Sequence, residues 1–145
     1  MTLLSRRALY AIAAVVDVAL HARPAPVSAK ALAARHKLGP RHLESVLNAL
    51  VRTSILKGVR GPRGGYELAR ERRRITVGEI VRAAGGAAAS DEAASDLIAE
   101  VIAPVIDRAA GAFLDELDRI SVEELCAKAG ASSENGPLRS PEFTI

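Results

Sequence analysis

Apolar residues recur at three- and four-residue steps in several stretches of the chain, which is the spacing of helices that bury one face. The first stretch covers about residues 5–21 and ends at the sequence RPAP. Asp17 lies within it, and the helical spacing continues past this acidic residue, so the pattern predicts a folded helix rather than a cleaved leader peptide. The periodic apolar residues of this helix are Leu9, Ile12, Val16, Ala19 and Leu20.

Two shorter helices are predicted next from their first residues. Ser28 is suited to cap a helix over about residues 29–36, because its hydroxyl can accept a hydrogen bond from a free backbone amide of the first turn. Pro40 suits the first position of a third helix, about residues 40–53, where its missing N–H costs nothing. Two short helices joined by a glycine turn are typical of a helix-turn-helix. The apolar stripe of the third helix consists of Leu43, Val46, Leu47 and Leu50.

The sequence VRGPRGGYEL at residues 59–68 predicts a β-hairpin. The segments ILKGVRG and GYELA are typical of short strands, and GPRG between them is typical of a tight turn. We expect Gly64 and Gly65 to adopt the positive φ that such turns require. A hairpin that directly follows the second helix of a helix-turn-helix is a wing. The predicted fold is therefore mostly α with a small two-stranded wing, a winged helix-turn-helix domain followed by a long dimerisation helix.

The second half of the chain is again helical. Thr76 and Glu79 form a capping box for a short helix that ends at Gly85 and Gly86. A connector of small and polar residues follows, in which Ser90 can cap the next helix.

A long helical pattern then runs from about residue 91 to residue 118, with a kink or a break expected at Pro104. Nothing obvious in the chain would cover its apolar stripe, so a second copy of the chain is the expected partner. The recurring apolar residues of this stripe are Ile98, Val101, Val105, Ala109, Ala112, Phe113 and Leu117. A last helix is predicted to open at the capping box of Ser121 and Glu124 and to extend to about residue 129.

The charge distribution divides the chain into two parts. Residues 1–86 carry 16 Lys/Arg against 5 Asp/Glu, a net charge of +11, whereas residues 87–145 carry 4 against 12, a net charge of −8. A basic domain suits a polyanion, because Lys and Arg that bind phosphates release condensed counterions; the alternative is solvated charge on helix faces. We expect a DNA-binding winged helix-turn-helix domain over residues 1–86, a dimerisation region over residues 87–130 and a disordered tail over residues 131–145.

Four segments of the chain form a specific ordered set: SRRALYAIAAVVDVALHA, VSAKALAARHKLGPRHLESVLNALVRTSILKGVRGPRGGYELA, ITVGEIVRAAGG and AFLDELDRISVEEL. Over about residues 5–128 they resemble the bacterial winged-helix transcription regulators that include IscR and NsrR, and the most specific match is the wing, VRGPRGGYELA. The resemblance implies a homodimer that binds double-stranded DNA at a near-palindromic operator, and we expect this regulator to act as a repressor. The second helix of the motif would enter the major groove and the wing the adjacent minor groove, which agrees with the shapes of the two grooves.

The resemblance implies roles for two wing residues. Arg60 matches the family's wing arginine and is assigned to the minor groove, where a narrow A·T-rich segment has the strongest negative potential. Arg63 stands where the family often has glycine. It adds a phosphate contact or is solvated charge, and the two alternatives have equal weight.

The resemblance also assigns candidate DNA contacts on the helices. Glu44 matches a position that can accept a hydrogen bond from a cytosine amino group, and His42 and Ser45 stand where the family places other base-reading side chains. Arg41 contacts phosphate or a guanine edge. Ser28 is a phosphate candidate at a helix N-terminus, with a plain capping role as the alternative.

The chain departs from the family at the cofactor. Well-known members carry three closely spaced cysteines that ligate an iron–sulfur cluster, whereas the corresponding segment here, AAASDEAASDLIAEVIAP, has neither Cys nor His. Such a cluster needs several thiolate or imidazole ligands, and Cys126 is the only cysteine. We therefore expect no iron–sulfur cluster, no metal site and no other cofactor.

The signal that controls the protein is left open by the sequence. Cys126 is either a small buried hydrophobe or a redox switch near the dimer interface. An unidentified small-molecule effector, bound between the long helix and the winged domain, is a third alternative. The sequence does not identify the operator, the regulated genes or the effector, and it does not separate a repressor from an activator.

Other classes of protein fit the sequence less well. It has no phosphate-binding glycine loop, nucleophile motif or metal-binding spacing of histidines, so we expect no enzyme activity. A winged helix can also serve as a protein-interaction module, and this remains the alternative function. No apolar run reaches the roughly 18 residues that span a bilayer, and a single cysteine suits a reducing compartment, so we expect a cytoplasmic protein that binds no membrane.

Overall fold

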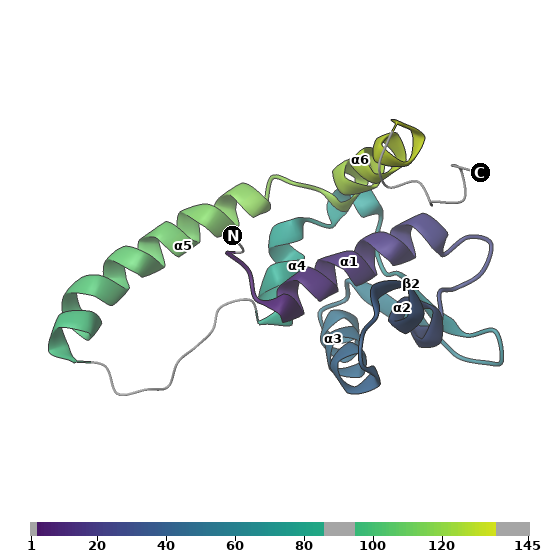
Figure 1. Cartoon of the computed structure of the whole chain (residues 1–145), viewed down its shortest axis with the longest axis horizontal. Helices are drawn as coiled ribbons and strands as arrows, with labels where there is room; N and C mark the ends of the chain where they lie inside the picture. The colour runs from purple at the N-terminus through teal and green to yellow at the C-terminus, as the bar shows by residue number, and fades with distance from the viewer. Residues whose placement is uncertain (1–2, 86–94, 136–145) are drawn as a thin grey trace, which may run out of the picture.

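The computed structural model describes residues 3–85 and 95–135, and Figure 1 shows the arrangement of the elements. The winged helix-turn-helix order that the sequence predicts is confirmed. The elements are α1 (Arg6–His21), α2 (Ala29–His36), α3 (Pro40–Arg52), β1 (Leu56–Val59), β2 (Gly65–Leu68), the 3-10 turn η1 (Arg72–Arg74), α4 (Val77–Ala84), the π-helical segment η2 (Ile98–Ile102), α5 (Ala103–Leu117) and α6 (Val122–Asn135).

The starts of α2 and α4 are fixed by side chains, as the sequence predicts. The Ser28 hydroxyl accepts a hydrogen bond from the amide of Ala31 at 3.1 Å. The capping box of α4 is complete: the Glu79 amide donates to the Thr76 hydroxyl at 3.2 Å, and the Glu79 carboxylate accepts from the Thr76 amide at 3.1 Å. These bonds satisfy amides that have no partner within the helix.

The core of the domain lies between α1, α3 and α4. Helix α1 contributes Ala8, Ala11 and Ala14, all fully buried, and such small side chains let α3 and α4 pack closely against it. The predicted apolar stripe of α3 is buried, which leaves the opposite face of this helix exposed. The buried stripe consists of Leu43, Val46, Leu47 and Leu50.

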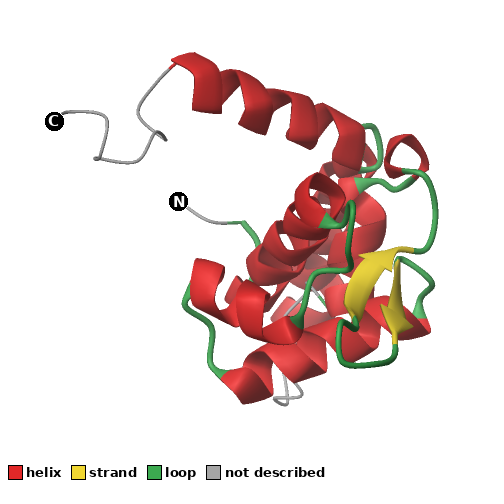
Figure 2. Ribbon diagram, turned by 90° about the vertical axis from the view of Figure 1, so that its right-hand side faces the viewer, coloured by secondary structure: helices red, strands yellow, loops and turns green. Residues whose placement is uncertain are grey.

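The predicted wing is confirmed, but the turn chemistry differs from the prediction. Strands β1 and β2 pair antiparallel at the edge of the helical body (Figure 2), from Leu56 opposite Leu68 to Val59 opposite Gly65. Gly61 adopts the positive φ, at 116°, so the prediction of this role for Gly64 and Gly65 was wrong.

Gly64 and Gly65 are needed for close backbone approach instead. A Cβ on Gly64 would collide with the carbonyl of Val59, and a Cβ on Gly65 with the carbonyl of Val27. Val27 adds a third backbone segment to the wing: its amide donates to the Tyr66 carbonyl at 3.0 Å, and its carbonyl accepts from the Tyr66 amide at 2.7 Å.

Helix α5 extends away from the domain body (Figure 1) and contacts α4 on one side. The α-helix begins at Ala103, next to Pro104 and directly after η2, and the backbone stays helical through this point. The hydrogen-bond pattern changes from π to α there, so the helix is not broken at Pro104. The predicted connector with its cap at Ser90 lies outside the described residues. Six large apolar residues along η2 and α5 are at least 43% exposed, and we call them the apolar face of α5: Leu97, Ile98, Val101, Ile102, Val105 and Ile106.

Helix α6 folds back onto the winged domain. The amide of Val77 donates to the carbonyl of Ile120, and the amide of Val122 donates to the carbonyl of Ile75, both at 2.8 Å. Val122 is fully buried, and α6 packs against α1 and η1. At the start of α6, one of the two hydrogen bonds of the predicted capping box is present: the Glu124 backbone amide donates to the Ser121 hydroxyl at 3.1 Å.

The end of α6 differs from the sequence prediction. The helix runs to Asn135 rather than to about residue 129, so the first residues of the expected tail are helical. The rest of that tail and the predicted domain boundary after residue 86 lie outside the described residues. Within the part that the structure describes, none of the helices is both long and apolar enough to cross a membrane.

Candidate nucleic-acid interface

The outer face of α3 presents polar side chains at helical spacing. Arg41, Glu44, Ser45 and Asn48 are exposed on the side opposite the buried stripe. Together with the end of the helix they line an open hollow of about 630 Å³. Because residues three and four apart share a helix face, one surface brings together three of the predicted DNA contacts. His42 is exposed on the flank of the same helix.

The wing presents the other predicted contacts. Arg60 and Arg63 are exposed at the tip of the hairpin. Ser28 and Arg60 line one open hollow of about 390 Å³ between the start of α2 and the wing. The Ser28 hydroxyl is a confirmed helix cap, and because it uses a lone pair for this bond, its proton is still available to a second partner.

The cations of this interface are free of acidic partners. Among the described residues, no carboxylate lies within 4.0 Å of the guanidinium groups of Arg41, Arg60 or Arg63. By contrast, Arg73 pairs with Glu71 at 2.7 Å on the side of the domain near α6. A patch of unpaired guanidinium groups attracts anions more strongly than one whose charges are neutralised.

One contact of this face was not predicted from the sequence. The Arg7 guanidinium donates to the Ser45 hydroxyl at 2.7 Å, although the two residues are 38 positions apart. No local pattern signals such a tertiary bond. Asn48 and Arg52 also line the hollow on α3, and their signal is the helical spacing from Glu44 and Ser45.

Helix α2 is anchored by a buried carboxylate rather than by apolar packing alone. Asp17 of α1 is only 4% exposed and accepts two bonds from Arg35, both at 2.7 Å, and one from His36 at 2.8 Å. Burial alone would raise the pKa of Asp17, but the hydrogen bonds from Arg35 and His36 outweigh it and hold this pKa below its ordinary value of 3.8. The charged cluster therefore fixes the first helix of the helix-turn-helix on α1.

Cys126 lies on the buried side of α6 and is 5% exposed. Burial raises the pKa of its thiol, and the nearby Arg72 only partly offsets this effect. Since the thiolate is the reactive form of cysteine, this environment disfavours reaction.

The residues of this chain do not fit an iron–sulfur cluster. Cys126 is the only cysteine, and it faces the protein core. His21 and His36 are hydrogen-bonded to Asp17, and His42 lies apart on α3. Across residues 3–85 and 95–135, no group of three or more His, Cys, Asp or Glu side chains is placed to hold a metal ion.

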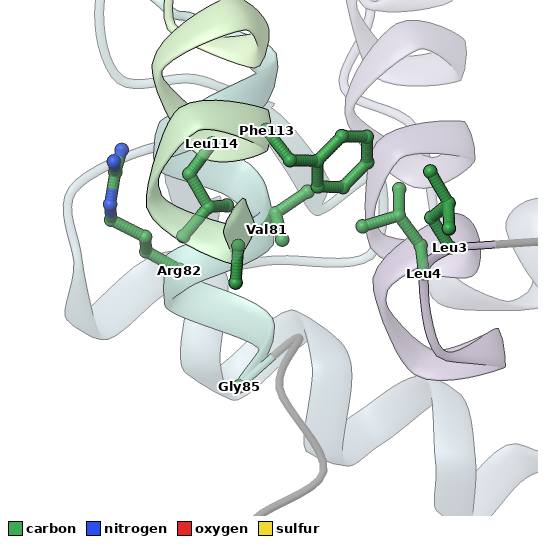
Figure 3. Close-up of a pocket in the computed structure, with 8 residues that line it drawn as sticks. Leu3, Leu4, Val81, Arg82, Gly85, Phe113 and Leu114 are labelled. Carbon is green, nitrogen blue, oxygen red and sulfur yellow. The ribbon is translucent and has the colours of Figure 1, made fainter. Parts of the chain in front are cut away.

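An apolar cavity of about 330 Å³ lies between α5 and the winged domain. Figure 3 shows Leu3 and Leu4 from the start of the chain across from Val81 of α4 and Phe113 and Leu114 of α5. This cavity lies where the sequence prediction placed the binding site of an unidentified small-molecule effector, one of its three alternatives for the controlling signal.

Known proteins with similar sequences and structures are transcription regulators. The HTH-type transcriptional regulator IscR of Xenorhabdus nematophila is 36% identical over 80 residues, which is 55% of this chain and 49% of that protein. The chain spans about half the length of the curated relatives it matches.

Two solved structures share nearly the whole fold. IscR of T. potens has a TM-score of 0.71 and 28% identity, and the match covers 97% of this chain and 95% of that one. CymR, the global cysteine regulator of B. subtilis, has a TM-score of 0.67 and 26% identity, and the match covers 88% and 98%.

The model of the Rrf2 family, described as an iron-dependent transcriptional regulator, matches residues 4–128. This match includes all the elements that form the winged domain, together with α5 and the start of α6. The expectation of an IscR-like winged-helix regulator is thereby confirmed, and the chain belongs to the Rrf2 family of transcription regulators.

Proposed function

We propose that this protein binds double-stranded DNA sequence-specifically and represses transcription. The observation that carries the proposal is the exposed face formed by Arg41, Glu44 and Ser45 on α3 together with Arg60 and Arg63 on the wing, whose guanidinium groups have no carboxylate partner among the described residues. We call this set the reading face. Helix α3 and the wing lie on the side of the domain away from α5 and α6 (Figure 1), so a duplex can approach both.

Each part of the reading face suits a different groove. A helix fits the major groove, where every base pair has a distinct pattern of donors and acceptors. Glu44 can accept from a cytosine amino group there, while Ser45, His42 and Arg41 can reach neighbouring base edges or phosphates. Arg60 suits the narrow minor groove.

The proposed DNA-binding unit is a homodimer. The apolar face of α5 exposes large side chains, such as Val105 at 54% and Ile106 at 59%, and monomeric proteins rarely expose a continuous apolar stripe of this kind. A second copy presents an identical stripe, so the same residues on both chains can cover each other across a two-fold axis. Such a dimer would read a near-palindromic operator.

The proposed regulator works without an iron–sulfur cluster. Among the residues that the structure describes, no group of three or more His, Cys, Asp or Glu side chains could hold a metal ion, and the chain's single cysteine, Cys126, is buried; both observations support this proposal. Burial of its thiol also favours a packing role for Cys126 over the alternative of a redox switch. The cavity between α5 and the winged domain leaves room for a small apolar effector.

A selection of bound fragments from a random DNA pool tests the proposal. At about 0.15 M salt, wild type should enrich a palindromic motif whose half-site centres are about one helical turn apart. Arg60→Ala should enrich it poorly and lose preference for A·T pairs beside each half-site. Arg73→Ala is the matched control, since it removes an exposed arginine that pairs with Glu71 away from the reading face.

The selection also separates the alternative function. If wild type enriches no motif, and Arg60→Ala and Arg73→Ala weaken DNA binding equally, the domain does not read sequence. The winged-helix module would then serve protein contact instead.

A further inference from the structure

Arg7 connects three parts of the protein through one guanidinium group. This half-buried residue lies in the first turn of α1. Its Nε donates to the carbonyl oxygen of Ala84, the last residue of α4, at 2.8 Å. Its Nη1 donates to the Ser45 hydroxyl at 2.7 Å, and its Nη2 donates to the Ser45 carbonyl at 3.3 Å. The recognition helix α3 is thus tied to the end of α4 through a single side chain.

This bond determines what the Ser45 hydroxyl can do. A serine hydroxyl has one proton to donate and two lone pairs that accept. Arg7 occupies one lone pair, and no acceptor among the described residues takes the proton of Ser45. Because Ser45 is exposed on the reading face, its proton is left for a group outside the protein.

We propose that Arg7 is a specificity-determining positioning residue that makes Ser45 a hydrogen-bond donor to a base in the major groove. This inference rests on the proposed function. A donor at this position selects base edges that present acceptors, which are N7 and O6 of guanine, N7 of adenine and O4 of thymine. It disfavours the cytosine edge, whose N4 group is itself a donor.

The geometry requires an arginine. The carbonyl of Ala84 lacks a helical partner because α4 ends there, and a guanidinium can donate to it and to Ser45 at the same time through separate nitrogens. A lysine at position 7 would have one ammonium to serve both anchors. Hydrogen bonds from a charged donor are also stronger than neutral ones, so the arrangement holds Ser45 in one orientation.

A direct phosphate contact by Arg7 is the competing explanation. The guanidinium has five N–H donors, and the three bonds to Ala84 and Ser45 leave one on each Nη nitrogen. A phosphate contact would strengthen binding equally for every sequence and would steepen the salt dependence. A positioning role would instead change the base preference at one place in each half-site.

The test is a comparison of base preferences by DNA selection for wild type, Arg7→Ala, Ser45→Ala and the double variant. We expect Ser45→Ala to lower discrimination at one base pair of each half-site by about five- to tenfold, the loss typical of one base contact. Arg7→Ala should lower it at the same base pair, and the double variant should lose no more than the single variants. Arg6→Ala, which removes the exposed neighbouring arginine, should keep the wild-type profile.

Two results would overturn the inference. One is a uniform affinity loss in Arg7→Ala, with every base preference intact and a shallower salt slope. The other is a Ser45→Ala profile identical to that of wild type. If Arg7→Ala unfolds, as circular dichroism would reveal, Arg7→Lys replaces it and should reduce the same preference. A wild type that enriches no motif would contradict the proposed function itself, whereas a clear wild-type motif with an unchanged Arg7 variant contradicts only this inference.

Discussion

In the winged domain, most large apolar side chains of α1, α3 and α4 are buried, and the exposed ones (Leu9, Leu20 and Val51) are scattered, whereas along η2 and α5 six large apolar side chains are exposed together. The first pattern is that of a unit that buries its own core. The second is that of a surface that remains to be covered. This difference fits the proposed division of roles, in which folding and DNA binding depend on the winged domain and dimerisation depends on η2 and α5. Substitutions in the two regions should therefore affect different measurements.

The largest effect is expected from a charge on the apolar face of α5. Val105→Asp should convert the proposed dimer to a monomer and weaken binding to the full operator by about 100-fold, because an unpaired charge in an apolar interface costs about 3 kcal/mol or more. Sedimentation and operator titration measure these two changes. Ala99→Asp is the control, since it adds the same charge at an exposed position outside the apolar face. A dimeric Val105→Asp variant would show that this face is not the interface.

A loss of folding stability is expected from the buried carboxylate of the winged domain. Asp17→Asn should lower the free energy of unfolding by about 2 kcal/mol, because a buried amide cannot replace the charge-assisted hydrogen bonds that the buried Asp17 carboxylate accepts from Arg35 and His36. Urea denaturation measures this change in the free energy of unfolding. Asp118→Asn breaks the more exposed pair with Arg82 and should cost clearly less. Equal losses in the two variants would contradict the anchoring role of Asp17.

The same carboxylate makes stability depend on acid pH. The pKa of Asp17 is lowered in the folded protein because hydrogen bonds from Arg35 and His36 outweigh burial. Its stabilising effect is therefore fully present above the ordinary value of 3.8 and is lost as the pH falls through the lower folded-state value. In urea titrations from pH 6 to below pH 3, we expect wild type to lose more stability than Asp17→Asn, and parallel losses would argue against this prediction.

A moderate effect on function alone is expected from the wing. Arg60→Ala should weaken operator binding by about tenfold, the value of one good groove contact, and should leave dimerisation and unfolding unchanged. Fluorescence anisotropy with the selected operator measures the affinity. The contrast with Val105→Asp is then sharp, because one variant stays dimeric and the other does not.

The smallest effect is expected from the thiol. Cys126→Ala should lower the free energy of unfolding by about 1 kcal/mol, because it leaves a small cavity. DNA binding should be insensitive to oxidant in both wild type and this variant. Operator binding measured with and without hydrogen peroxide tests this expectation. A peroxide response in wild type that is absent in Cys126→Ala would establish the redox alternative.

The features that could be predicted from the sequence are the ones that depend on neighbouring residues. Ser28 and the pair of Thr76 and Glu79 act within a single helical turn, so their capping bonds follow from local spacing. The polar face of α3 follows in the same way from the buried stripe on its other side.

Two of the features that were missed depend on tertiary contacts. The need for glycine at position 65 comes from the backbone of Val27, which the sequence does not place beside the wing. The bond between Arg7 and Ser45 joins two separate helices. A third missed feature is the end of α6, which continues through Gly130 to Asn135. Glycine has a low helix propensity, and the sequence prediction ended the helix there, but propensity is only a weak guide to where a helix ends.

The most direct test of a dimer that reads DNA through α3 and the wing is a hydroxyl-radical footprint of wild type on its selected operator. Two symmetric protected regions with centres about 10 base pairs apart, both lost on Val105→Asp and both weakened on Arg60→Ala, are the predicted result. A single protected region, or uniform weak protection that neither substitution changes, would contradict the account.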